Sequence, residues 1–158
     1  MRKRIITPSE QTQRSDLSVE WLDLEQLATV ELTSEDAAYP IESALTAGGG
    51  PGWRADSPGK QIIRLVFDEP LNITRIQLLF KEEEHARTQE FALSWKADKS
   101  ESSHEILRQQ YNFSPPENTL EREDYKLELN ALVMLEISIT PDISDGPSRA
   151  SLTQLRLA

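Results

Sequence analysis

The sequence contains no cysteine, which excludes disulfide bonds and any chemistry that depends on a thiolate. It has no apolar run of about 18 residues, the length that a membrane-spanning helix needs. The amino-terminal stretch MRKRIITPSEQTQR begins with basic residues but lacks the apolar segment of about 7 to 15 residues found in secretory signals. We therefore expect a cytoplasmic protein that does not enter a membrane.

Positive charge is also scarce. The chain carries 17 lysines and arginines against 27 aspartates and glutamates, which gives a formal net charge of −10. A field of this sign repels a polyanion unless the basic residues gather on one face. The one basic cluster is RKR at residues 2–4, close to the terminus. The composition therefore disfavours nucleic acid as a partner.

Motifs for catalysis or cofactor binding are missing as well. The stretch ALTAGGGPGW at residues 44–53 is rich in glycine, but the later Gly59-Lys60 pair is followed by Gln61, not by the serine or threonine of a phosphate-binding loop. No Gly-x-Ser-x-Gly sequence is present, and the two histidines lack a second histidine or cysteine at metal-ligand spacing. We expect no catalytic residue, no cofactor and no metal site.

What the sequence does contain is short segments in which apolar and polar residues alternate, the pattern of a strand with one buried face. These segments are ATVEL (28–32), QIIRLVF (61–67), ITRIQLLF (73–80), FALSW (91–95), EILRQQYNF (105–113), YKLEL (125–129), VMLEISI (133–139) and SLTQLRL (151–157). No long helical pattern separates them. About eight short strands joined by turns predict an all-β fold, an antiparallel β-sandwich.

The length of 158 residues suits one domain. Residues 1–16 are polar and show no apolar periodicity, which predicts a flexible amino-terminal arm. Residues 17–158 are then expected to form a single β-sandwich domain.

The connections between strands predict where a ligand would bind. DEPLN at residues 68–72 is typical of a short hairpin in which Pro70 ends one strand, and a second short connection is expected at 130–131. Because successive antiparallel strands reverse direction, alternate loops return to the same end of the sandwich. The loops expected at one end are 47–60, 81–89, 113–124 and 141–149, with 68–72, 97–103 and 130–131 at the other. The end with the long loops is the expected binding end.

The glycine-rich stretch has a structural interpretation. Its glycines allow positive φ and close approach of backbone, Pro51 stiffens the bend, and the bend directs Trp53 into the core. Trp21 and Trp95 also fall on apolar phases of expected strands, so we expect both of them in the core. The alternative for one of them is an exposed ring that stacks on the face of a sugar.

The order of these features resembles discoidin domains, the coagulation factor type C family of the galactose-binding-like β-sandwiches. The matching features are Ala44-Leu45, Trp53, Gln61 with Ile63, Leu65 and Phe67, Pro70, Ile73 with Ile76 and Leu78, Arg87 before FALSWKAD, and the closing ASLTQLRLA. The likeness covers about residues 28–158 and implies a jelly-roll sandwich.

The chain departs from this family at its calcium site. Many members bind a structural calcium through the loop before the tryptophan, often with an aspartate, and through a glutamate in the last strand. This chain has Thr46-Ala47-Gly48 and Gln154 at those places. Calcium prefers charged oxygen ligands, so we expect no bound calcium.

The resemblance implies a non-catalytic binding module whose common ligand class is carbohydrate, held by loops at one end. At that end the expected polar contacts are Arg54, His85 and Arg87, and Phe113 is the expected stacking surface. Arg87 has an alternative role in a structural salt bridge with neighbouring acids. The alternative function is a protein–protein interaction or assembly module of a cytoplasmic complex, since free polysaccharide is scarce there. The sequence does not define an oligomeric state.

Overall fold

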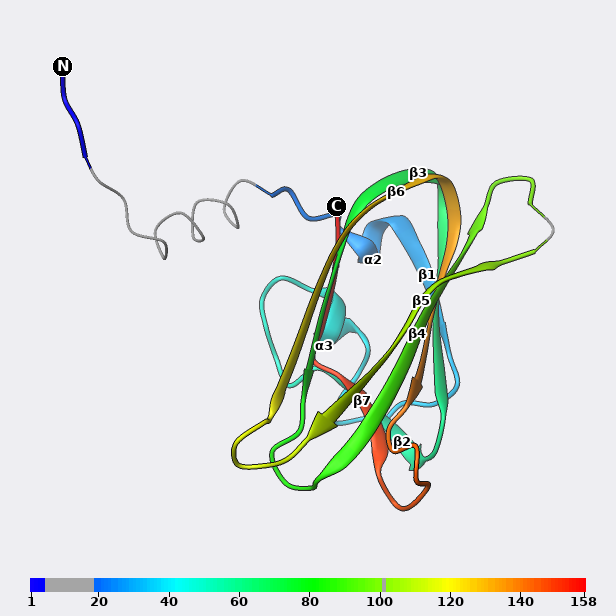
Figure 1. Cartoon of the computed structure of the whole chain (residues 1–158). Coiled ribbons are helices and arrows are strands. Elements are labelled where there is room, and N and C mark those ends of the chain that lie inside the picture. Colours follow the sequence, from blue (N-terminus) through cyan, green and yellow to red (C-terminus); the bar gives the residue numbers. More distant parts are fainter. Residues whose placement is uncertain (5–18, 101) are drawn as a thin grey trace.

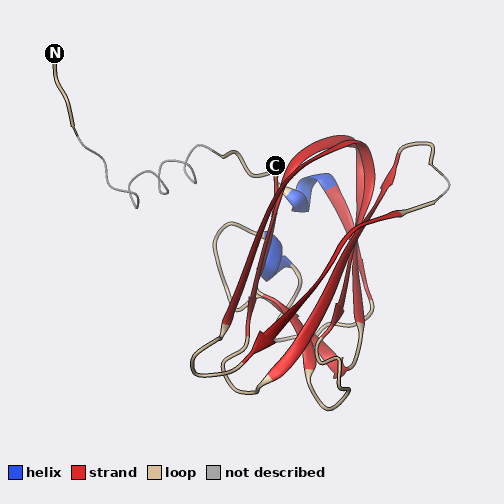
Figure 2. Ribbon diagram, viewed as in Figure 1, coloured by secondary structure: helices blue, strands red, loops and turns tan. Residues whose placement is uncertain are grey.

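The structure is a computed structural model that describes residues 1–4, 19–100 and 102–158. Apart from its first four residues, the predicted arm at 1–16 lies outside the described residues. The remainder forms a β-sandwich with two short helices (Figures 1 and 2). The strands are β1 (Ala28–Leu32), β2 (Trp53–Pro58), β3 (Gln61–Lys81), β4 (Arg87–Ala97), β5 (His104–Phe113), β6 (Leu120–Thr140), β7 (Arg149–Leu152) and β8 (Gln154–Leu157). The prediction of an antiparallel β-sandwich with about eight strands is confirmed.

Two four-residue helices, α2 (Leu24–Leu27) and α3 (Glu42–Leu45), accompany the strands. They cover one open side of the sandwich (Figure 1). Within the described ranges, no helix has the length and apolar character needed to cross a membrane.

The two long strands, β3 and β6, belong to both layers of the sandwich. Residues 61–66 of β3 pair with β1 on one side and with residues 134–139 of β6 on the other. Residues 76–79 of β3 pair instead with β8, and with residues 122–125 of β6. Strand β4 extends the first layer beyond β6, and β5 forms its far edge. Both long strands therefore rise in one layer and descend in the other, as the arch in Figure 1 shows.

The hairpin predicted at 68–72 is therefore wrong, and so is the short connection predicted at 130–131, because both segments lie inside continuous strands. Residues 68–72 are part of β3, and the β3–β6 register shifts between Val66 and Leu71 as the strand bends. Pro70 lies inside this irregular stretch, where it occupies no regular position of the ladder. The partner bend in β6 contains Ala131, whose φ of 55° is in the left-handed region. Asn72 Oδ1 accepts a 2.9 Å hydrogen bond from the Ala131 backbone N–H and links the two bends.

The core fills the space between the layers with the residues that alternate inward. Ile63, Leu65 and Phe67 are buried on the first half of β3, and Ile76, Leu78 and Phe80 on the second. Trp53 is buried at 1% exposure, as predicted, and Trp95 packs against the core with part of its surface exposed. The prediction that Trp21 is a core residue is wrong. Its ring is half-buried and lies against the guanidinium groups of Arg75 and Arg156, at 5.3 and 5.9 Å.

The long loops meet at one end of the sandwich, opposite the arch of β3 and β6 (Figure 1). The Glu82 N–H donates to the Thr119 carbonyl at 2.8 Å, and the Ile143 N–H donates to the Thr88 carbonyl at 2.9 Å. The Gly59 N–H approaches the carbonyl of Ser148 at 3.4 Å. These contacts connect the four loops that the sequence predicted to cluster. Because β3 and β6 each cross from one layer to the other at the arch, the chain returns to this end just as it would after a hairpin.

Candidate functional site

A small two-stranded sheet, formed by β2 and β7, supplies one wall of a groove at the long-loop end. Trp53 pairs with Leu152 and Arg54 with Ser151 in the antiparallel register. Since side chains alternate along a strand, Trp53 and Leu152 point into the core, whereas Arg54 and Ser151 share the outer face. Strand β2 was not predicted from the sequence, which placed these residues in the loop at 47–60.

The glycine-rich loop before β2 determines how closely this wall approaches the sandwich. Gly52 has a φ of +83°, and a Cβ there would lie 2.6 Å from the Leu152 carbonyl oxygen. Only glycine combines this backbone conformation with this approach. The Gly52 N–H donates to Ser43 Oγ at 3.1 Å, and Trp53 Nε1 donates to the Ser34 carbonyl at 3.1 Å. The loop is the predicted bend that brings Trp53 into the core.

The opposite wall begins at Lys81, the last residue of β3, and continues through the acidic turn at 82–84. Lys81 points outward because Phe80 before it is buried. Glu82 is fixed from two sides, by a 2.8 Å hydrogen bond from Arg87 Nε and a 3.1 Å hydrogen bond from the Glu84 N–H. Partial burial acts to raise the pKa of Glu82, but these donors outweigh it and hold the pKa below 4.5. Glu82 is therefore an ionised anchor for the turn.

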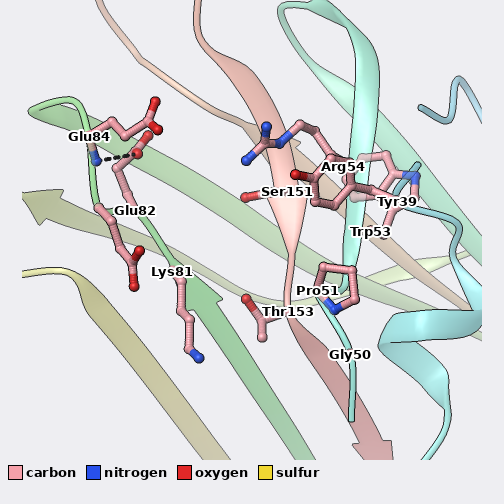
Figure 3. Close-up of a pocket in the computed structure, with 11 residues that line it drawn as sticks. Tyr39, Gly50, Pro51, Trp53, Arg54, Lys81, Glu82, Glu84, Ser151 and Thr153 are labelled. Atoms are coloured by element: carbon pink, nitrogen blue, oxygen red, sulfur yellow. Dashed lines mark hydrogen bonds between the residues drawn. The ribbon is translucent and has the colours of Figure 1, made fainter. Parts of the chain in front are cut away.

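Between these walls lie two hollows of about 230 and 190 Å³, which share Arg54, Lys81 and Ser151 among their lining residues. We call this continuous depression the loop-end groove. Figure 3 shows its first part, with Arg54 and Ser151 on one side and the acidic turn on the other. Polar groups of six residues line it: Arg54, Lys81, Glu83, Glu84, Ser151 and Thr153.

Arg54 is the best oriented of these groups. Its guanidinium lies over the Tyr39 ring, 4.5 Å from the centroid, and the Arg54 backbone N–H donates to the Tyr39 carbonyl at 3.2 Å. Stacking holds the planar group at the groove while it leaves the edge donors available. Arg54 was a predicted contact residue, and the structure places it in the loop-end groove.

Two other predicted contact residues, Arg87 and Phe113, are buried. The Arg87 side chain is 1% exposed and donates to Glu82 at 2.8 Å and to the Pro141 carbonyl at 2.7 Å. Phe113 is 2% exposed, and Arg87 lies 4.8 Å over its ring. Phe113 therefore has no face on which a sugar could stack, and that prediction is wrong. Arg87 takes its alternative role, a structural salt bridge with a neighbouring acid, beneath the groove wall.

His85, the remaining predicted contact, lines the second hollow beside Arg54 and Arg87. Its side chain is 74% exposed, and its Nε2 is 3.8 Å from a carboxylate oxygen of Glu84. The structure thus brings Arg54 and His85 to one groove as the sequence predicted.

The sequence reasoning did not identify Lys81, Ser151 and Thr153. The sequence does indicate the outward direction of Lys81 and Ser151, because each follows a residue on the apolar phase of its strand. Thr153 lies between β7 and β8, and its N–H donates to the Leu79 carbonyl at 2.9 Å.

A buried polar group lies deeper in the same end of the molecule. Gln89 Nε2 donates to Glu121 Oε1 at 3.0 Å, and Gln89 Oε1 is 3.3 Å from Arg87 Nη1. Glu121 is 1% exposed, and its Oε2 has no hydrogen-bond partner. Burial, together with the neighbouring Glu123 carboxylate, raises the pKa of Glu121 to about 8. A neutral carboxylic acid is therefore buried at this end of the molecule near pH 7.

The residues at the family's calcium position do not fit that ion. Thr46 and Ala47 offer no carboxylate oxygen to the ion, and the pocket that they line contains Arg156 as well as Asp23 and Glu25. The Gln154 amide oxygen, in its favoured orientation, accepts from Arg156 Nε at 2.9 Å. Within the described residues, no group of three His, Asp or Glu side chains could hold a metal ion.

No family model matches the sequence, and no curated protein matches it. Solved structures do match the fold. A family 32 carbohydrate-binding module (CBM32) of AlyQ, in complex with 4,5-unsaturated mannuronic acid, has a TM-score of 0.59 and 17% identity, with 89% of this chain and 98% of that chain covered. The family 32 module of C. perfringens NanJ, in complex with galactose, has a TM-score of 0.58 and 12% identity over 87% of this chain and 96% of that chain.

A family 29 fucosidase of Ruminococcus gnavus in complex with fucose also matches, with a TM-score of 0.64 and 10% identity over 86% of this chain. This chain spans 26% of the length of the fucosidase. The neighbours thus include binding modules solved by themselves and one region of a larger enzyme. What these likenesses show is that the chain has the galactose-binding-like, or discoidin-like, β-sandwich fold of the family 32 carbohydrate-binding modules.

Proposed function

We propose that this chain is a non-catalytic carbohydrate-binding module that holds its sugar in the loop-end groove. The observation that carries the proposal is the arrangement of donors opposite acceptors across that groove. Arg54 and the Ser151 hydroxyl lie on one wall, and Glu84 lies on the other (Figure 3). Glu83, the preceding residue of the acidic turn, also lines the groove. A sugar hydroxyl both donates and accepts, so neighbouring hydroxyls of one ring can bond to both walls.

The same groove supports binding better than catalysis. Its acidic turn contains Glu82, which is already held by Arg87, and the strongly exposed Glu84. Glu121, which has the raised pKa that a general acid needs, is buried at 1% exposure beside Gln89 and is not among the residues that line the groove. A ligand bound between the walls therefore meets hydrogen-bonding groups without a proton donor matched to glycoside cleavage.

The structural neighbours agree with this proposal, since two of them were solved with mannuronic acid or galactose bound. Their low identity leaves the sugar of this chain to be determined from its own residues. The alternative is a protein-interaction or assembly module, and the experiment below separates the two.

The proposal is tested by glycan-array screening and by thermal shift of the whole chain with each sugar found. A ligand that binds the folded state alone raises the melting temperature by mass action. Ser151→Trp fills the groove from an outward position on β7, and Thr29→Trp is its matched control on an exposed position of β1. We expect a sugar-dependent shift in the wild type and in Thr29→Trp, and none in Ser151→Trp.

Equal shifts in both tryptophan variants would place the sugar elsewhere and contradict the assignment of the groove. Absence of any sugar-dependent shift, together with a stable complex with another protein, would favour the interaction module. Circular dichroism of each variant confirms that it is folded.

A further inference from the structure

We infer that the sugar bound in the loop-end groove is acidic, and that its carboxylate lies against Arg54. The inference rests on the proposed function, because it names the chemistry of the ligand for the same groove. The inference is based on two cations, Arg54 and Lys81, which have no ion-pair partner among the described residues of an acidic protein.

Arg54 and Lys81 both line the groove, and neither has an ion-pair partner among the residues that the structure describes. Several other arginines of the described residues are paired. Arg64 contacts Glu136 at 2.8 Å, Arg108 contacts Glu105 at 2.6 Å, and Arg87 contacts Glu82 at 2.8 Å. With 27 acidic residues in the chain, two cations that line one groove without an ion-pair partner leave a place for an external anion.

The Arg54 guanidinium is suited to direct contact. Its stacking on Tyr39 at 4.5 Å fixes its plane, so little side-chain entropy is lost when a ligand binds. A carboxylate matches the parallel N–H donors of a guanidinium edge. The Ser151 hydroxyl, on the register partner of Arg54, lies beside it and can donate to the same anion (Figure 3).

The acidic turn orients such a ligand. Glu84 lies on the wall opposite Arg54 (Figure 3), Glu83 of the same turn also lines the groove, and their carboxylates repel an anionic group. They accept hydrogen bonds from sugar hydroxyls instead. The groove therefore favours a sugar ring with its carboxylate toward β2 and its hydroxyl edge toward the turn. A neutral sugar would donate hydrogen bonds to the carboxylates of the turn but would offer no anion to Arg54.

The two cations are expected to act differently. Arg54 makes a directed contact, whereas Lys81 on β3 is a flexible point charge that raises the local potential. A screened interaction weakens with salt because the Debye length falls from about 10 Å at 0.1 M to a few ångströms near 1 M. The contribution of Lys81 should therefore disappear at high salt, while part of the Arg54 contribution remains.

The test compares acid–neutral pairs that differ only at C6: galacturonate with galactose, glucuronate with glucose, and mannuronate with mannose. Dissociation constants are measured by NMR titration of the whole chain in 50 mM and 500 mM NaCl. We expect the acid of at least one pair to bind about tenfold more tightly at low salt, as one charge-assisted contact gives. Galactose 6-sulfate distinguishes a carboxylate-specific contact from general anion binding.

Arg54→Met should abolish the preference for the acid, and Lys81→Met should reduce it about threefold at low salt only. Lys126→Met, an exposed position on β6 outside the groove, is the matched control and should change nothing. Equal or tighter binding of the neutral sugars would overturn the inference but leave the proposed function intact. Preference for sulfate over carboxylate would overturn the carboxylate contact. Failure of every sugar to bind would overturn the proposed function itself.

Discussion

Glu121 makes folding stability depend on pH in a direction opposite to that of most carboxylates. Its pKa is raised from 4.5 to about 8 in the folded protein, first because burial disfavours the charged form and then because Glu123 lies close by. The folded state therefore keeps a proton that the unfolded chain releases above about pH 4.5. This stabilisation is fully present below pH 4.5 and is lost as the pH rises toward 8.

The magnitude follows from the same two values. Each pKa unit corresponds to about 1.4 kcal/mol, so the difference between 4.5 and about 8 sets an upper limit of about 5 kcal/mol. Structural relaxation and water entry around the carboxylate reduce this limit. A fall of about 2 to 3 kcal/mol in unfolding free energy between pH 5 and pH 8 is the expected result.

Glu121→Gln isolates the effect, because glutamine has nearly the same shape and is neutral at every pH in this range. The variant should match the wild type within about 1 kcal/mol at pH 5 and exceed it by about 2 kcal/mol at pH 8. Glu128→Gln, at an exposed position of the same strand, is the control and should keep the slope of the wild type. Unfolding free energies come from urea titrations at half-unit pH intervals. A wild-type stability that rises from pH 5 to pH 8 would contradict the raised pKa of Glu121. A Glu121→Gln variant with the wild-type slope would contradict it as well.

Three further substitutions test the parts that shape the groove. Gly52→Ala puts a Cβ 2.6 Å from the Leu152 carbonyl oxygen at a φ of +83°, so it should lower unfolding free energy by more than about 2 kcal/mol in urea denaturation. A loss within error would show that the loop relaxes freely. Arg87→Met should cost about 3 kcal/mol because it leaves Glu82 without its buried partner, and calorimetric melting checks this. Retained stability would mean that Glu82 turns to solvent. Trp53→Ala should cost about 3 to 5 kcal/mol, measured by urea denaturation, and a loss below 1 kcal/mol would contradict its place in the core.

The strands were predictable because alternation along a strand is a local property of the sequence. Ile63, Leu65 and Phe67 are inward as their spacing indicated, and so are Ile76 and Leu78. The continuity of β3 was not predictable in the same way. Whether a chain turns back beside itself or crosses to another layer is decided by the partner strand, here through the shared bend of Asn72 and Ala131.

The site was predictable in position but less so in its residues. The clustering of the loops could be predicted from the alternating direction of successive strands. Arg54 and His85, both predicted at the end with the long loops, do line one groove. The prediction for Phe113 was wrong because it relied on the position of this residue at the edge of a loop. Phe113 also lies on the apolar phase of β5, and that phase faces inward, which leaves it 2% exposed. Arg87 illustrates a different limit, since only the fold shows that Glu82 and the Pro141 carbonyl enclose it. The cytoplasmic location stays a prediction.

The most direct test of a sugar-binding groove is residue-resolved NMR of the ¹⁵N-labelled chain during titration with the sugars that the array identifies. We expect the largest amide shifts on Arg54, Ser151, Thr153 and the turn at 82–84, with the arch at 68–72 unchanged. Shifts centred on the arch, on the exposed edge of β5, or nowhere at saturating sugar would contradict this expectation.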